Sequence, residues 1–135
     1  MDEAKKKSEP GDYVPVNVAE HRGRLLVTAP LAGCNLRNIR VLLQGNRLDL
    51  EARPMGGQNM DYLLHEWHPG LYRRSVQLPL PVTGEGAFAH YGNGLLIVHL
   101  EKAEKVQPET SYSIEVTTPS HEEVHPGEKP NEAGS

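Results

Sequence analysis

Short apolar segments that alternate with polar residues, each closed by a turn signal, constrain the fold of this chain more than any other feature. The clearest pair is Ile39–Leu43 and Arg47–Glu51, with Gly45-Asn46 between them. A Gly/Asn dipeptide between two such runs is typical of a two-residue β-hairpin loop. The second run alternates leucines with charged residues, which gives a strand one buried and one solvated face. This stretch therefore predicts an antiparallel hairpin.

Further segments of the same character extend the pattern along the chain. They are Tyr13–Val18, Arg24–Ala29, Leu71–Leu78, Phe88–Tyr91 and Leu95–Leu100. Pro15 restricts the first to an edge or irregular strand, whereas the last is the most apolar run and favours a central strand. The chain has 13 glycines and 11 prolines but only seven aromatic residues, and no segment shows a convincing helical period. We therefore expect an all-β, immunoglobulin-like antiparallel β-sandwich with an aliphatic core.

The two ends of the chain differ in composition from its middle. Residues 119–135 contain four Glu, one Lys and almost no apolar side chain, and residues 1–12 are also polar. Such segments cannot bury enough apolar surface to offset the entropy of ordering them. We expect a short disordered arm at 1–12, the sandwich at 13–104, and a C-terminal extension at 105–135 that ends in a disordered, negatively charged tail.

Charge and composition exclude several classes of partner. The net charge of −4 provides no basic field for nucleic acid. No window approaches the run of about eighteen apolar residues that a membrane span needs, and the polar start of the chain does not resemble a signal peptide. The single cysteine, Cys34, fits a reducing compartment. We therefore expect a cytoplasmic protein that binds neither nucleic acid nor membrane.

No group of residues predicts catalysis. His121-Glu-Glu-Val-His125 has the spacing of a zinc-peptidase motif, but it lies in the predicted disordered tail without a third ligand. His65 and His68 form a loop pair without the other half of a site, and Cys34 is more simply an ordinary loop thiol. His99, within an apolar strand, is expected to be half exposed. We expect no enzyme activity, no metal and no cofactor.

The segment Arg53–Gly70 interrupts the regular spacing of the strands. A loop of this length inside a compact domain is usually functional or makes its own contacts. Its apolar piece, Tyr62–Leu64, could be a short strand. Because a lone strand leaves its backbone groups unsatisfied, pairing with a partner subunit is a plausible outcome.

A second apolar outlier lies near the tail. Ile114 and Val116 are two residues apart in a polar stretch, so they point to the same side of an extended chain. Two interpretations stay open: the segment Ser111–Thr117 is a last strand of the domain, or it is a linear docking motif that adds to a sheet edge.

At this point the sequence resembles the small heat shock proteins, the Hsp20 or α-crystallin family. From Ala89 the chain reads A-H-Y-G-N-G-L-L-I-V-H-L-E-K, close to the family signature A-x-x-x-n-G-v-L-x-v-x-l-p-K. Four further pieces follow the family order between residues 13 and 102, and Ile114-x-Val116 resembles the family's C-terminal I-x-I/V motif. Departures are Ala32 and Glu101, which stand where the family usually has Pro, and the short polar arm at 1–12.

The resemblance implies an ATP-independent chaperone, or holdase, that binds partly unfolded client proteins and limits their aggregation. It also implies a homodimer or a higher oligomer, in which a strand of the long loop is exchanged between subunits. The exchanged segment would be 59–66, and the residues concerned are Met60, Tyr62, Leu63, Leu64 and Trp67.

The resemblance further implies a docking groove between two edge strands, here Ile39–Leu43 and Phe88–Tyr91. Ile114 and Val116 would be the docking motif, and Val41, Leu43 and Phe88 are the candidates for the groove walls. An equally open alternative is that Val41, Leu43 and Phe88 face the core. Asn93 and Gly94 would form the structural turn of the signature.

Other functions remain as alternatives. A CS/p23-like co-chaperone or adaptor shares the sandwich but binds folded partners as a monomer, and it lacks both the long exchanged loop and the I-x-I motif. A metal-dependent hydrolase would rest on His121 and His125 alone. A structural or coat protein would form ordered polymers without binding clients.

Overall fold

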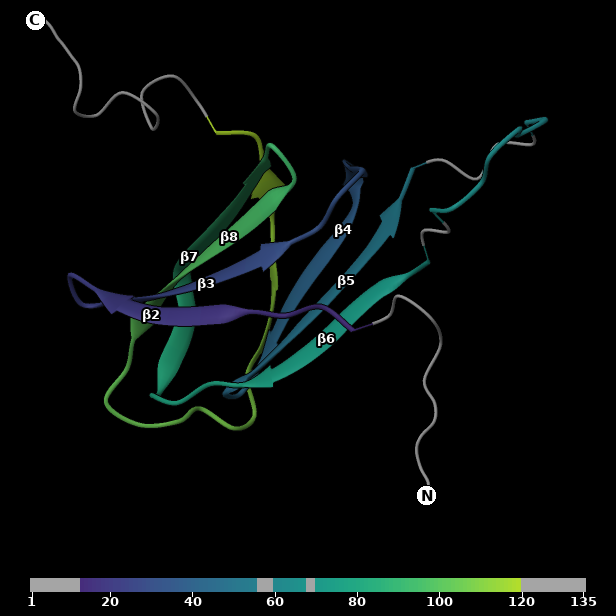
Figure 1. Ribbon diagram of the computed structural model, residues 1–135. Helices are drawn as coiled ribbons and strands as arrows, with labels where there is room; N and C mark the ends of the chain where they lie inside the picture. Colours follow the sequence, from purple (N-terminus) through teal and green to yellow (C-terminus); the bar gives the residue numbers. More distant parts are fainter. Residues whose placement is uncertain (1–12, 56–59, 68–69, 120–135) are drawn as a thin grey trace, which may run out of the picture.

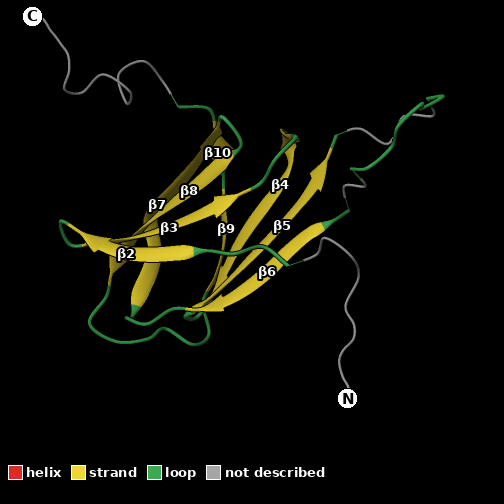
Figure 2. Cartoon of the chain, viewed as in Figure 1, coloured by secondary structure: helices red, strands yellow, loops and turns green. Residues whose placement is uncertain are grey.

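The computed structural model describes residues 13–55, 60–67 and 70–119, and these form two β-sheets that face each other (Figure 1). One sheet has the order β10-β7-β8-β3-β2, and the other has the order β6-β5-β4-β9. The strands are β2 (Asn17–His21), β3 (Arg24–Pro30), β4 (Cys34–Gln44), β5 (Arg47–Pro54), β6 (Tyr72–Gln77), β7 (Val82–Gly92), β8 (Leu95–Lys102), β9 (Ser111–Ile114) and β10 (Val116–Thr117). The described residues contain no helix, and the predicted all-β sandwich is confirmed (Figure 2).

Tight turns fix the registers of two hairpins. The predicted hairpin is confirmed, because β4 and β5 are antiparallel neighbours joined through Gly45-Asn46. β7 and β8 are joined through Asn93 and Gly94, whose φ angles are 54° and 78°. Positive φ at both central residues defines a type I′ turn, which suits Asn-Gly. β8 lies in the middle of its five-stranded sheet, as predicted for the most apolar run.

The core between the sheets is entirely aliphatic among the described residues, as predicted. β5 shows the expected alternation, with Leu48, Leu50 and Ala52 buried and the charged residues between them outside. The remaining buried hydrophobic residues are Val14, Leu25, Val27, Ala29, Leu31, Ile39, Val41, Leu43, Val76, Leu78, Val82, Ala89, Leu96, Val98, Leu100 and Ile114. Both sheets therefore bury one face against the other and leave one face to solvent.

Two predicted strands begin at clearly different residues in the structure. The first strand begins at Asn17 rather than Tyr13, because the chain before it carries Pro15 and only Tyr13 forms a bridge, with Arg73. The strand predicted at Phe88–Tyr91 begins earlier, at Val82, and passes through a register irregularity between Thr83 and Phe88. A glycine-rich start of this kind looks like a loop in sequence but is a bulge in the structure.

The predicted short strand at Tyr62–Leu64 is not a strand in the structure. Its backbone lies in an irregular stretch between β5 and β6, and no strand among the described residues pairs with it. The predicted arm at 1–12, the motif His121–His125 and His68 lie outside the described residues.

Asn46 joins the β4–β5 turn to the connection between the two sheets. Its side-chain Nδ2 donates to the carbonyl oxygens of Leu78 and Leu80, at 3.1 and 2.8 Å, and its Oδ1 accepts from the Val82 amide at 3.0 Å. Its own carbonyl accepts from the Leu78 amide at 2.9 Å. Asn46 is the only buried polar residue among the described ones, being 8% exposed. The side chain therefore holds the segment between β6 and β7 against the hairpin.

We predict that Asn46→Ala destabilises the domain by about 2–3 kcal/mol, because buried donors and acceptors lose their partners. Chemical denaturation followed by circular dichroism measures the change. Asn38→Ala, at an exposed position of β4, is the matched control and is expected to stay within about 0.5 kcal/mol of the wild-type chain. Equal stability of the Asn46→Ala and Asn38→Ala variants would contradict a stabilising role for the Asn46 hydrogen bonds.

Candidate functional site

The edges of β4 and β7 lie on the same side of the sandwich, and one C-terminal segment covers both. β9 is antiparallel to β4, with Ile114 opposite Val41 and Tyr112 opposite Leu43. After Glu115 the chain crosses to the other sheet, where β10 runs parallel to β7 with Val116 opposite Ala89 (Figure 2). The backbone groups of two sheet edges, which would otherwise be open to another chain, are thereby paired within this chain.

The predicted docking residues lie within this junction. Ile114 is 6% exposed and belongs to the core cluster, and Val116 is partly buried against that cluster. Both of the interpretations left open by the sequence therefore describe part of the structure. The segment forms strands of the domain, and it does so by addition to two sheet edges. A role in joining one subunit to another stays a prediction.

The three predicted groove walls have different positions. Val41 lies opposite Ile114 across the β4–β9 ladder; it belongs to the buried core and also lines the pocket described below. Leu43 is 1% exposed and packs in the core. Phe88 lies on the outer face of the five-stranded sheet, because strand alternation turns its neighbour Ala89 inward. The structure thus keeps Val41 at the groove and places Phe88 away from it.

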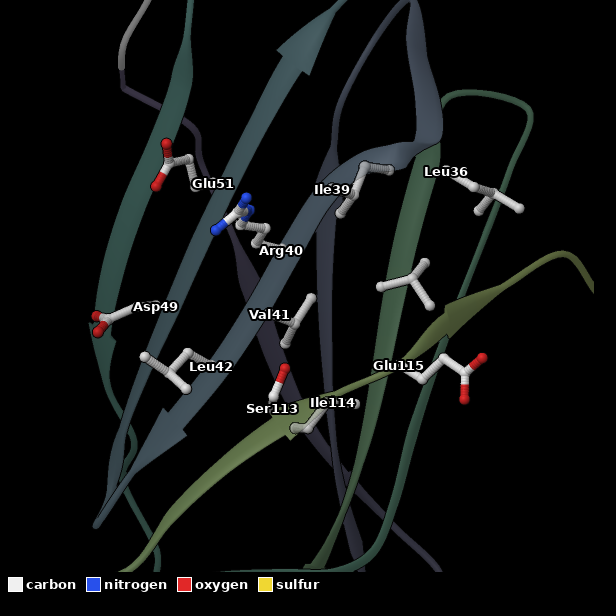
Figure 3. Close-up of a pocket in the computed structure, with 11 residues that line it drawn as sticks. Leu36, Ile39, Arg40, Val41, Leu42, Asp49, Glu51, Ser113, Ile114 and Glu115 are labelled. Carbon is white, nitrogen blue, oxygen red and sulfur yellow. The ribbon is translucent and has the colours of Figure 1, made fainter.

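A pocket of about 690 Å³ adjoins the covered β4 edge (Figure 3). Ile39 and Val41 lie on the inner side of β4, and Arg40 and Leu42 lie on the outer side. Arg40 is directly opposite Glu51 across the β4–β5 ladder. The full lining is Leu36, Ile39, Arg40, Val41, Leu42, Asp49, Glu51, Ser113, Ile114, Glu115 and Val116. An apolar floor with a mainly acidic rim suits an apolar segment flanked by polar or basic residues.

The sequence analysis did not predict the polar rim of this pocket. The register of the β4–β5 hairpin could have indicated it, because the two-residue turn places Arg40 opposite Glu51 and Leu42 opposite Asp49.

Residues 60–67, between β5 and β6, extend away from the two sheets (Figure 1), and their apolar side chains are exposed. Leu63 is fully exposed and Leu64 is 75% exposed; Met60, Tyr62 and Trp67 are also exposed. The loop has two local contacts. Tyr62 stacks on His65 at a ring distance of 4.1 Å, and the Trp67 ring lies so close to Gly33 that a Cβ there would be 3.2 Å from it.

The outer face of the five-stranded sheet is unusually apolar and aromatic. Phe88 stacks on His99, with ring centroids 4.2 Å apart, and the Arg24 guanidinium lies 5.7 Å from the Phe88 ring centroid. Leu95 and Ile97 occupy the same face of β8, and Leu95 is exposed. His99 is half-buried, as expected from its place in the strand.

The outer face of the four-stranded sheet is polar by contrast. Asp49 accepts from Arg47 at 3.1 Å and from the Ser75 hydroxyl at 2.5 Å. The two outer faces thus offer different chemistry, and only the face of the five-stranded sheet suits apolar partners.

Cys34 has the features of an ordinary thiol. Its amide donates to the Tyr91 hydroxyl at 3.2 Å, and partial burial raises the pKa of the thiol. Burial, and then the proximity of Cys34 and Tyr91, raises the pKa of Tyr72. A raised thiol pKa lowers the thiolate fraction at neutral pH and therefore the reactivity of Cys34.

Two further classes of site are not found in the described part of the chain. Residues 13–55, 60–67 and 70–119 contain no group of three or more His, Cys, Asp or Glu side chains arranged to hold a metal ion. Within the same residues there is no helix of a length and apolarity that could cross a membrane.

Comparisons with solved structures find the same sandwich in several heat shock proteins. Heat shock protein 16.0 from Schizosaccharomyces pombe is 22% identical over 77% of this chain and 77% of its own, with a TM-score of 0.60. HSP18.5 from E. histolytica is 22% identical over 73% of this chain and 98% of its own, with a TM-score of 0.59. A small heat-shock protein from Xylella fastidiosa, described as having a distinct high order structure, is 20% identical over 72% of this chain and 92% of its own, with a TM-score of 0.59.

No match to the chain was found among curated proteins. The model of the Hsp20/alpha crystallin family, however, matches residues 17–117, from the first residue of β2 to the last residue of β10. This range includes the sandwich, the exposed loop and the C-terminal strands that cover its edges. The chain therefore belongs to the Hsp20/alpha crystallin family.

Proposed function

We propose that the protein is an ATP-independent holdase, which binds partly unfolded proteins and keeps them from aggregating. The observation that carries the proposal is apolar surface outside the core of a chain that belongs to this family. It lies on the loop 60–67 and on the outer face of β7 and β8, around Phe88 and Leu95. Unfolded chains expose apolar side chains, and complementary apolar surface binds them.

Mass action explains how such binding protects a client. A protein that binds the unfolded state lowers its free concentration, and aggregation falls because it depends steeply on that concentration. The activity needs no bond-making group, which agrees with the raised thiol pKa of Cys34. The unpaired Cys34 also suits a reducing compartment, and we propose the cytoplasm as the place of action.

We further propose that the exposed loop joins two copies into a homodimer. The loop presents Met60, Tyr62, Leu63, Leu64 and Trp67 to solvent, and β2 forms the outer strand of its sheet, so one of its edges has no partner among the described residues. If the loop of each subunit pairs with β2 of the other, exposed apolar area and unpaired backbone groups are removed together. This places the exchanged strand, which is irregular in the single chain, on the partner.

We predict that Leu63→Asp/Leu64→Asp shifts the dimer to monomer, because a charge cannot enter an apolar interface without a partner. Size-exclusion chromatography with multi-angle light scattering measures the mass. Val106→Asp, at an exposed apolar position of the linker before β9, is the matched control and should leave the dimer intact. A dimer that survives the double substitution would exclude loop exchange.

The holdase proposal is tested by light scattering of a heat-labile client protein without ATP. We predict that the full-length chain suppresses scattering at near-stoichiometric ratios. Leu95→Ser/Phe88→Ser should weaken suppression severalfold because it removes apolar contact area from the outer face. Ser75→Ala, on the polar outer face of the other sheet, is the control and should retain full suppression.

Two further variants separate docking from solubility. Ile114→Ala/Val116→Ala reports on the C-terminal docking motif, and removal of residues 119–135 reports on the charged tail. The holdase proposal would be wrong if the full-length chain did not suppress scattering while its circular dichroism spectrum showed a folded β-sheet protein. The family assignment would be unchanged.

A further inference from the structure

The backbone conformation at position 84 does not explain why the residue there is glycine. Two residues later Gly86 has a φ of +74°, a value that favours glycine, but Gly84 is not among the residues with positive φ. Its surroundings supply the reason. A Cβ atom at Gly84 would lie less than 3.0 Å from three atoms of the Tyr112 ring, closer than real Cβ contacts come. The Tyr112 ring therefore occupies the space that a side chain at position 84 would need.

Tyr112 belongs to the same side of the C-terminal segment as the docking residues. It precedes Ile114 by two residues in β9, and side chains two apart in a strand point to one face. Its partner across the ladder is the buried Leu43, while its ring reaches β7 of the opposite sheet. The ring is half-buried and packs against the core cluster. Tyr112, Ile114 and Val116 thus form a row of three inward side chains.

Backbone contacts fix the register of this row. The Gly45 amide donates to the Thr110 carbonyl at 3.0 Å, at the turn where β4 ends. A Cβ at Gly45 would lie 3.3 Å from the Pro108 Cα, so the incoming chain runs close to the turn. With Thr110 held at the turn and Ile114 opposite Val41, Tyr112 faces the opposite sheet, and its ring lies against the backbone of Gly84.

We propose that Gly84 and Tyr112 form a third anchoring site, so that the groove between β4 and β7 reads the pattern aromatic-x-Ile-x-Val. The occupant is residues 108–117 of this chain, whether supplied by the same molecule or by a second copy. Segments that carry only an I-x-V pair leave the hollow over Gly84 empty and bind more weakly. The inference deepens the proposed docking role of Ile114 and Val116 and rests on it.

The proposal can be tested by enlarging the side chain at position 84 and shortening the one at position 112, because the Tyr112 ring fills the space beside Gly84. Hydrogen exchange with mass spectrometry on the full-length chain measures how often the segment 111–117 opens. We expect Gly84→Ala to accelerate exchange there by about 10- to 100-fold, because the added methyl group displaces an aromatic anchor. In a Tyr112→Ala background the same Gly84→Ala change should have no further effect, because the ring that it would strike is gone.

Two controls test whether the faster exchange comes from the contact between Gly84 and Tyr112. The amides of β8, the central strand, should exchange at the same rate in all variants, which shows that the fold is intact. Glu85→Ala, an exposed neighbour of Gly84 in the same strand, should leave the segment as protected as in the wild-type chain. Equal acceleration by Gly84→Ala with and without Tyr112, or no acceleration in the wild-type background, would overturn the proposal.

A second measurement tests selectivity between molecules. Two fluorescently labelled peptides of residues 107–118, one with the native sequence and one with Tyr112→Ala, are followed by anisotropy. They are titrated with a full-length chain that carries Gly84→Ala together with Ile114→Ala/Val116→Ala, because the last two changes weaken the hold of its own segment on the groove. We expect the peptide with Tyr112→Ala to bind about tenfold more tightly than the native peptide. Equal binding of the two peptides would contradict the third site. Neither measurement depends on client aggregation, so failure of the holdase proposal and failure of this one are distinguishable.

Discussion

Two sheet edges on one side of the sandwich impose the constraint on which the rest of the structure depends. Without β9 and β10, β4 and β7 would each be the last strand of a sheet there, and their backbone groups must be paired or exposed. A single segment pairs with both, first as β9 and then as β10. Its inward side chains complete the core at the same time. The same segment thus protects two sheet edges, completes the core and occupies the groove, because it crosses from one sheet to the other.

The aliphatic core has a consequence for the surface. Leu, Val, Ile and Ala fill the fully buried interior, so no aromatic side chain among the described residues is fully buried. Phe88 lies on an outer face and Trp67 in an exposed loop, where they enlarge the apolar area in contact with water. For a monomeric protein such surface would favour aggregation. In the proposed holdase, the same surface would bind unfolded chains and a second copy of the protein.

The sequence predicted the strands with strong alternation and the turns with Gly and Asn, because these signals are local. It missed the start of β7, since Gly84 and Gly86 look like a loop until Tyr112 and the bulge explain them. The family resemblance made Phe88 a candidate for the groove walls and left a core position open, whereas the structure places it on the outer face of the five-stranded sheet. Tyr112 received no role, although it continues the row of Ile114 and Val116, because its partner Gly84 has no side chain to signal the contact.

The covalent attachment of the C-terminal segment sets how subunits compete for the groove. The C-terminal segment is connected to the sandwich only by the residues between the end of β8 at Lys102 and the start of β9 at Ser111. A short tether of this kind produces an effective local concentration in the millimolar range. A segment from another molecule, present at micromolar concentration, competes poorly until the tethered one opens. If the segment also docks on other subunits, as proposed, assembly through this groove would be governed by the opening equilibrium of the tethered segment, because each opening frees both a groove and a segment for another molecule.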